Sequence, residues 1–167
     1  MGSAYFTDCL HTGAVGEMIV ANYLVSAGHY VYTCYGVGSH PIDFYVTDVS
    51  GHIEYAVDVK TYPRRAYFND TGIDAGDWYK YVQISLKTPV RLFFIDHFEQ
   101  CCYSVNLSDA GAVAYESCGK VYIPLDCMKF EFRLNDSQLA AIVPARRSYN
   151  YANTRRYFAD NSNITVT

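Results

Sequence analysis

The sequence lacks several features that would assign a function directly. No stretch approaches the roughly 20 apolar residues of a membrane-spanning helix, and the first ten residues have neither the basic start nor the apolar core of a secretion signal. The six cysteines show no CxxC spacing, so we reject a zinc site and expect buried free thiols. We therefore expect a soluble protein with no membrane partner and a cytoplasmic, intracellular location, in a host cell if the protein is virus-encoded.

Positive charge is also scarce. The chain has 13 basic and 17 acidic residues, and its net charge of −4 excludes a polycation that coats nucleic acid along its whole length. Nucleic-acid binding would need a local basic patch and bound metal ions. The chain has 167 residues, half of them apolar. This length is enough for one domain with a hydrophobic core and too short for two domains of ordinary size.

Two short strands joined by a turn form the central feature of the sequence. Residues 42–46 and 53–60 alternate between apolar and polar side chains, as half-buried strands do. The turn-forming residues 48–51 separate them. The pattern predicts a β-hairpin with its tip at residues 49–50.

Three charged side chains share one face of this hairpin. The expected register places Asp43 opposite Ala56 and diagonal to Asp58, at a Cβ separation of about 7 Å. Lys60 follows on the same face. Two carboxylates at this distance suit a hard divalent cation such as Mg2+ or Mn2+. The alternative is a solvated outer face with a weak Asp58–Lys60 ion pair. The hairpin alone leaves both interpretations open.

The elements around the hairpin add two polar candidates. Residues 12–27 read as a helix that is apolar almost all round, which predicts a buried helix, and Glu17 is its only ionisable residue. A lone carboxylate on a buried helix needs a partner, and a ligand or water-positioning role competes with a solvent-reaching tip. Residues 77–88 read as a second helix that carries Gln83, with Asp77 as its N-cap.

The remaining segments read mostly as strands. Residues 90–96 are an apolar run typical of a central strand, residues 100–107 predict a further strand, and residues 108–117 predict a short helix. Two closing strands are expected near residues 121–125 and 129–134. We find no internal repeat and no linker between domains, and expect one domain over residues 1–167 with a C-terminal extension from about residue 143.

Arginines occur at two places where a phosphate backbone would pass. Arg64 and Arg65 follow the second hairpin strand, and Arg146 and Arg147 begin a segment that interleaves guanidinium groups with aromatic rings. We take all four as candidate nucleic-acid contacts. Solvated loop charges in the first case, and a tail that covers the domain in the second, are the alternatives.

The order of these elements and motifs resembles the PD-(D/E)XK nuclease superfamily. Pro41-Ile42-Asp43 followed by Asp58-Val59-Lys60 is similar to the signature of that family, Gly16-Glu17 is similar to its acidic first-helix position, and Gln83 is similar to a polar residue on its second helix. The resemblance covers roughly residues 12–96. It implies an α/β, restriction-endonuclease-like core with the order αβββαβ, in which helices flank a mixed central sheet.

The resemblance implies a Mg2+- or Mn2+-dependent nuclease that hydrolyses DNA phosphodiester bonds. Asp43, Asp58, Glu17 and the Val59 carbonyl would hold the metal, Lys60 would orient water or stabilise the phosphate, and Gln83 would orient water or contact the backbone. DNA is the expected partner, and a homodimer stays open. The alternatives are a non-catalytic nucleic-acid-binding module, or a protein-interaction module such as an inhibitor of a host defence system.

Overall fold

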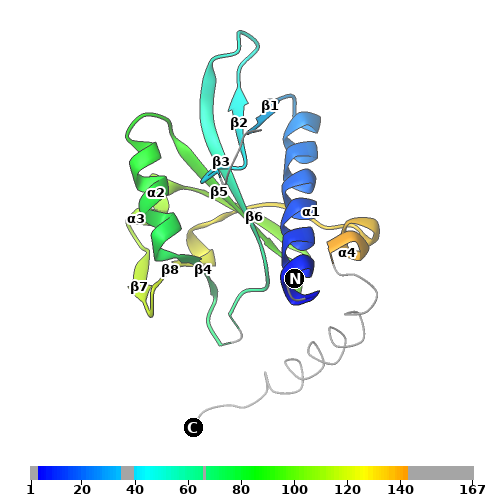
Figure 1. The fold of residues 1–167 in the computed structure, drawn as a ribbon, viewed down its shortest axis with the longest axis vertical. Helices are drawn as coiled ribbons and strands as arrows, with labels where there is room; N and C mark the ends of the chain where they lie inside the picture. Colours follow the sequence, from blue (N-terminus) through cyan, green and yellow to red (C-terminus); the bar gives the residue numbers. More distant parts are fainter. Residues whose placement is uncertain (1–3, 35–39, 66, 143–167) are drawn as a thin grey trace.

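The fold was analysed in a computed structural model, which describes residues 4–34, 40–65 and 67–142, with side chains from Leu10 onward. A long helix, α1 (Ala4–Ser26), stands beside a central sheet, and a shorter helix, α2 (Ala75–Ser85), lies on the other side (Figure 1). Within the described part of the chain, no helix is both long and apolar enough to cross a lipid bilayer.

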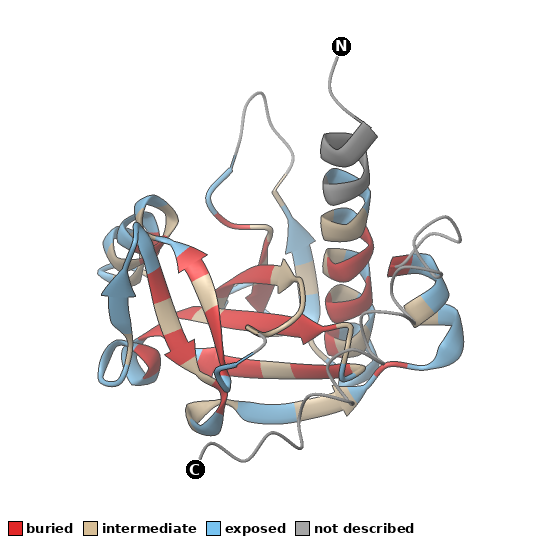
Figure 2. Ribbon diagram, turned by 90° about the horizontal axis from the view of Figure 1, so that it is seen from below, coloured by how far each residue is buried: buried red, intermediate tan, exposed pale blue. Residues whose placement is uncertain are grey.

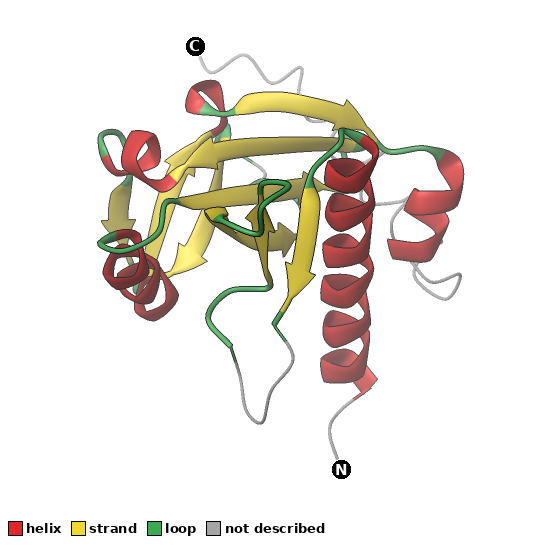
Figure 3. Cartoon of the chain, turned by 90° about the horizontal axis from the view of Figure 1, so that it is seen from above, coloured by secondary structure: helices red, strands yellow, loops and turns green. Residues whose placement is uncertain are grey.

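The central sheet has six strands in the order β1-β2-β3-β5-β6-β9 (Figure 3). Only β3 and β5 run parallel, and every other neighbouring pair in this sheet is antiparallel. The strands are β1 (Tyr30–Thr33), β2 (Phe44–Thr47), β3 (Ile53–Thr61), β5 (Val90–Asp96), β6 (Cys101–Asn106) and β9 (Lys129–Arg133). A parallel pair needs a crossover, which β4 and α2 provide here. The predicted mixed α/β sheet flanked by helices is confirmed, with β4 as an added strand.

A second, three-stranded sheet in the order β4-β8-β7 lies below α2 (Figure 1). Its strands are β4 (Asp70–Asp74), β7 (Tyr115–Ser117) and β8 (Lys120–Pro124), and the short helices α3 (Leu107–Gly111), η1 (Leu125–Cys127) and α4 (Asp136–Ile142) complete the described chain. The helix expected over residues 108–117 is wrong in its second half. Cys118 and Gly119 both adopt positive φ, which makes a tight hairpin turn that pairs β7 with β8.

Two apolar cores fill the two sides of the central sheet (Figure 2). The first packs α1 against one face, and its sheet residues include Phe44, Val57 and Val59. The second packs α2, through Trp78 and Tyr81, against the opposite face. Because successive side chains in a strand point to opposite faces, Asp58 and Lys60 belong to the α2 side.

Helix α1 is not buried all round, so the expectation of a fully buried helix is wrong. Leu10, Met18 and Val25 are exposed by more than half, whereas Val20 and Leu24 are buried against the sheet. One sheet face can cover only one side of a helix, and α4 covers only part of the rest. The apolar composition of α1 therefore exceeds what its single buried face requires.

The hairpin register differs from the expected one by two residues, and this difference brings the two aspartates closer together. Tyr45, not Asp43, lies opposite Ala56, and a bulge follows Val46. The turn is wider than expected, because the Asp48 carboxylate accepts hydrogen bonds from the backbone N–H groups of residues 50 and 52. Continued by one step, this register brings Asp43 directly beside Asp58 instead of diagonal to it.

Helix α2 begins at Ala75, two residues before the expected start. Asp74 precedes the helix and Asp77 lies in its first turn, so Asp77 is not the N-cap. A carboxylate in the first turn still interacts favourably with the helix dipole.

A glycine sets the distance between α1 and β3. A Cβ atom added at Gly16 would lie 1.8 Å from the Thr61 hydroxyl oxygen and 3.0 Å from its Cβ, so only glycine allows this close approach. The next residue along the helix is Glu17. The Gly16–Thr61 contact therefore fixes where the Glu17 carboxylate enters the fold.

We expect Gly16→Ala to lower the free energy of unfolding by about 1–3 kcal/mol, since rotating Thr61 cannot clear its own Cβ. Gly13→Ala is the matched control on the same helix, because a Cβ there meets nothing within 4 Å. That control should stabilise the protein by roughly 0.5–1 kcal/mol through helix propensity. Urea unfolding of both variants makes the comparison, and equal effects of the two substitutions would contradict the close-approach explanation.

Candidate functional site

Four of the charged residues singled out in the sequence meet at one end of β3. Asp58 and Lys60 lie on this strand, Asp43 lies beside Asp58 at the start of β2, and Glu17 reaches the group from α1. The charge of Asp58 acts on both Glu17 and Asp43, and Lys60 acts on the same two carboxyl groups. The four groups therefore form one electrostatic unit, built from three separate elements.

Asp58 is the most buried member of this unit. The residue is only 4% exposed, and the Lys60 ammonium lies 3.2 Å from Oδ1 and 3.0 Å from Oδ2. Lys60 donates its hydrogen bond to Oδ1, whereas Oδ2 has no hydrogen-bond partner among the described residues. Burying a carboxylate oxygen that accepts no hydrogen bond costs free energy. Asp58 Oδ2 is therefore available to accept a hydrogen bond or to bind a cation.

The electrostatics of the unit show a deficit of positive charge. Burial, followed by the charge of Asp58, raises the pKa of Asp43 to about 7, although Asp43 accepts a hydrogen bond from the Val59 N–H at 2.7 Å. Burial also raises the pKa of Glu17 and of Asp58. Three carboxylates and one ammonium carry a net charge of −2 when all are ionised. Lys60 alone does not neutralise them.

Helix α2 contributes a residue that sequence reasoning missed. Tyr81 is 1% exposed, and the Lys60 ammonium lies 5.7 Å from the centroid of its ring. Hydrogen bonding from Tyr81 opposes the effect of burial on the pKa of Asp58. The predicted residue of this helix, Gln83, is exposed. The signal for Tyr81 was its place three residues after the buried Trp78, on the same side of the helix.

The two arginines that follow β3 are engaged in internal ion pairs. Arg64 donates from Nε to Asp96 at 2.6 Å, and the Asp96 side chain is fully buried. Arg65 binds both carboxylate oxygens of Asp70. Their guanidinium groups thus hold the 62–70 segment together, and neither is a free surface charge. Arg146 and Arg147 lie outside the described residues.

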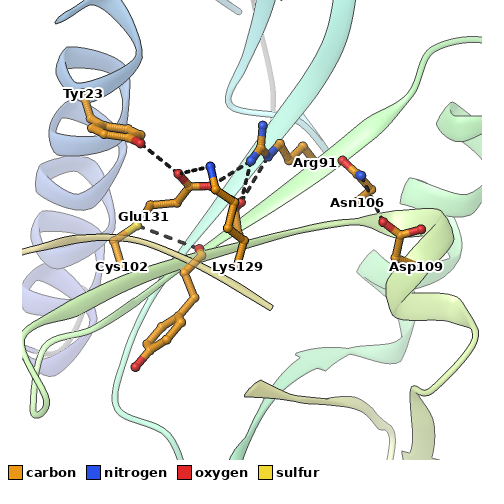
Figure 4. A network of polar contacts seen from close by, with 9 residues as sticks. Tyr23, Arg91, Cys102, Asn106, Asp109, Lys129 and Glu131 are labelled. Atoms are coloured by element: carbon orange, nitrogen blue, oxygen red, sulfur yellow. Dashed lines mark hydrogen bonds and ion pairs between the residues drawn. The ribbon is translucent and has the colours of Figure 1, made fainter. Parts of the chain in front are cut away.

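A second buried acid shows what a fully satisfied carboxylate looks like in this protein. Glu131 on β9 accepts hydrogen bonds from Arg91 and Ser104 on one oxygen and from Tyr23 and Lys129 on the other (Figure 4). Burial acts to raise its pKa, but these donors outweigh burial and lower it. Glu131 therefore ties β9 to β5, β6 and α1. The Asp43–Asp58 pair has no comparable set of donors.

The described residues do not already form a metal cage. Among them, no group of three or more His, Cys, Asp or Glu side chains stands at metal-binding geometry. The Val59 side chain packs in the core under α1. The backbone N–H of Val59 donates a hydrogen bond to the Asp43 carboxylate. The donor chemistry nevertheless fits a divalent cation, since the site has hard oxygen donors, an open Asp58 oxygen and a charge of −2 to balance.

Comparisons with known proteins gave structural neighbours only. No family model and no curated protein sequence matches the chain. A Holliday junction resolvase, Hjc, from Archaeoglobus fulgidus is 11% identical with a TM-score of 0.48, covering 69% of this chain and 90% of the resolvase. A nuclease from a fusellovirus is 9% identical with a TM-score of 0.48, covering 92% of this chain and 97% of the nuclease.

The raised carboxyl pKa values predict an unusual pH dependence of stability. Between pH 4 and 7 the native state keeps protons that the unfolded chain has already released, so the free energy of unfolding falls as pH rises through this range. One such group contributes a slope of up to about 1.4 kcal/mol per pH unit. Asp43→Asn, measured by urea unfolding in EDTA, should flatten the slope and raise stability at pH 8. A slope identical to that of the wild-type protein would remove Asp43 from the titrating group.

Proposed function

We propose that this protein is a metal-dependent nuclease that hydrolyses phosphodiester bonds in DNA. The observation that carries the proposal is the group formed by the buried Asp58 and the partly buried Glu17 and Asp43 around the single ammonium of Lys60. Such a group is unfavourable in a protein that uses it only for structure, because each charge loses water without gaining a full set of partners. A divalent cation removes this cost.

The cation would be held by oxygen atoms. Asp43 and Asp58 lie side by side and supply two carboxylates, Glu17 completes the set directly or through water, and the Val59 carbonyl is the remaining candidate. Oxygen donors favour Mg2+ or Mn2+ over softer metals. When bound, such an ion supplies Lewis acidity and neutralises negative charge that develops on a phosphate group.

The residues of the chain have separate tasks in this proposal. Lys60 presents an ammonium group beside the carboxylates, where it orients water by hydrogen bonding and offsets charge on the phosphate. The Tyr81 ring lies 5.7 Å from the Lys60 ammonium, and its hydroxyl acts to lower the pKa of Asp58, so it favours the ionised form of this carboxylate. Gln83, exposed on α2, would contact the DNA backbone or a water molecule.

The charge distribution points to the C-terminal residues as the source of DNA affinity. Residues 143–167 contain four arginines and one aspartate and carry a net charge of +3. Because the whole chain carries −4, residues 1–142 carry a net charge of −7. Seven of the nine described basic side chains are already paired with carboxylates, Arg64 and Arg65 among them. Arg146 and Arg147 remain our candidates for phosphate contacts.

Asp58→Asn and Lys60→Met should each leave a folded protein that has lost about 100-fold or more of its metal-dependent cleavage. Asparagine keeps the shape of the carboxylate and removes its charge, whereas methionine keeps the length of lysine and removes the ammonium. Cleavage of plasmid and oligonucleotide DNA is followed with Mg2+, with Mn2+ and with EDTA. Lys87→Met, an exposed lysine just beyond α2, controls for loss of one positive charge. Wild-type activity in both site variants would end the catalytic assignment.

Replacing Arg146 and Arg147 together by Gln in the full-length protein should weaken DNA binding and reduce the slope of log affinity against log salt by about 2. Two phosphate contacts are lost, so the effect should be the same for any DNA sequence. Arg133→Gln removes an exposed arginine on β9 and is the control, with little change expected. An unchanged salt slope in the double variant would exclude these two arginines as phosphate contacts.

A non-catalytic role is the second candidate, and the scarcity of unpaired basic side chains on the described surface favours its protein-interaction form over its nucleic-acid-binding form. The two functions differ in one measurement. Calorimetric titration of Mg2+ or Mn2+ should show a site that Asp43→Asn weakens if the protein is a nuclease. A protein that binds no divalent cation and cuts no DNA would be a nucleic-acid-binding or protein-interaction module on this fold.

A further inference from the structure

The outer face of the small sheet carries aromatic rings close to the proposed active site. Gly72 of β4, Tyr122 of β8 and Tyr115 of β7 lie opposite one another in register and form one row across the sheet. The neighbouring residues Ile73 and Val121 point the other way, into the core under α2. The tyrosine row therefore faces outward, with ring centroids of Tyr115 and Tyr122 5.6 Å apart.

This row begins where β3 ends. The Tyr122 ring lies directly on Gly72, since a Cβ atom there would be 2.7 Å from the ring. Tyr62, the residue after β3, donates a hydrogen bond from its hydroxyl to the Gly72 carbonyl on β4. Tyr62 follows Lys60 by two residues and feels the charge of Asp58. The Tyr62 side chain thus links the strand that carries Gly72 to the end of β3, two residues beyond Lys60.

A guanidinium group and a phenyl ring are layered on this row. Arg65 Cζ lies 3.7 Å from the centroid of the Tyr122 ring and 4.0 Å from the centroid of the Phe68 ring. Arg65 is fixed in this position because its Nε donates to Asp70 at 2.7 Å and the Tyr115 hydroxyl bridges to the same carboxylate at 2.8 Å. The result is a stack with Phe68 as its outermost layer.

Phe68 is 55% exposed although one side of its ring rests on Arg65. An aromatic ring kept in water at a fixed orientation is suited to stacking with a second flat group. The Asp70 carboxylate, two residues further along the chain, forms an ion pair with Arg65, which offsets its repulsion of a polyanion. The ring lies on an ion-paired guanidinium group that the Tyr115 hydroxyl also contacts, unlike the charge-depleted centre of a protein–protein interface.

We infer that Phe68, backed by Arg65 and Tyr122, is a stacking platform for an unpaired nucleobase of the DNA. The inference rests on the proposed function for the identity of the ligand and deepens it by naming the substrate class. A base in the interior of a duplex is already stacked on both sides, whereas a flap, a gap or a single-stranded end offers unpaired bases with a free face. The substrate is therefore DNA with unpaired nucleotides next to the bond that is cut.

Base stacking can be measured without cleavage, which separates this inference from the proposed chemistry. A single-stranded oligonucleotide with one 2-aminopurine is titrated with full-length protein in EDTA, and affinity is followed in parallel by fluorescence anisotropy. Wild-type protein should quench 2-aminopurine, whereas Phe68→Ala and Phe68→Leu should lose the quenching and about tenfold in affinity. Phe68→Trp should restore both, because it restores a flat ring.

Phe130→Ala is the matched control, because Phe130 is 49% exposed on the far edge strand β9 and should leave the signal unchanged. Equal affinity of Phe68→Ala and wild-type protein for the single strand would overturn the inference, as would a wild-type protein that binds blunt duplex as tightly as single strands. In the latter case the exposed ring would be a protein-contact site. Quenching lost in Phe68→Ala in a protein that cuts no DNA would support the platform and remove the nuclease.

Discussion

The structure depends on keeping two aspartates side by side where water is scarce. Asp43 and Asp58 come together because the β2–β3 register makes them neighbours, and α2 covers their face of the sheet. Burial in this position raises the pKa of both carboxyl groups, and Lys60 offsets only part of their negative charge. Glu131 accepts hydrogen bonds from four side chains, two on each oxygen. The same fold can therefore bury a carboxylate at little cost when donors are supplied.

The rest of the fold sets the geometry around this pair. The absence of a side chain at Gly16 lets α1 approach β3 closely enough for Glu17 to join the group. The parallel β3–β5 pair forces a crossover, and the crossover carries both α2 and the small sheet. Arg64 and Arg65 then fasten the segment between β3 and β4 to Asp96 and Asp70. Basic residues that would be expected to hold DNA are used to hold the chain.

The sequence predicted the elements better than the contacts between them. Alternation identified both hairpin strands, and the apolar run at residues 90–96 identified β5, because these patterns are local. The register failed by two residues, since the turn stabilised by the Asp48 side chain is one residue wider than expected and the bulge after Val46 adds a second, and alternation reports neither. Tyr81 was missed, and the ion pairs of Arg64 and Arg65 were not foreseen, because burial and long-range ion pairs are decided by tertiary packing. The Cys118–Gly119 turn, which replaced half of a predicted helix, needed a positive φ at a residue that rarely adopts one.

The two cores give the carboxylate group a further property. Glu17 arrives with the layer that packs on one side of the sheet, and Tyr81 arrives with the layer on the other. A chain in which only one layer has docked holds an incomplete group, however well formed that layer is. In the nuclease that we propose, cleavage competence would therefore appear only when both layers have docked on the sheet.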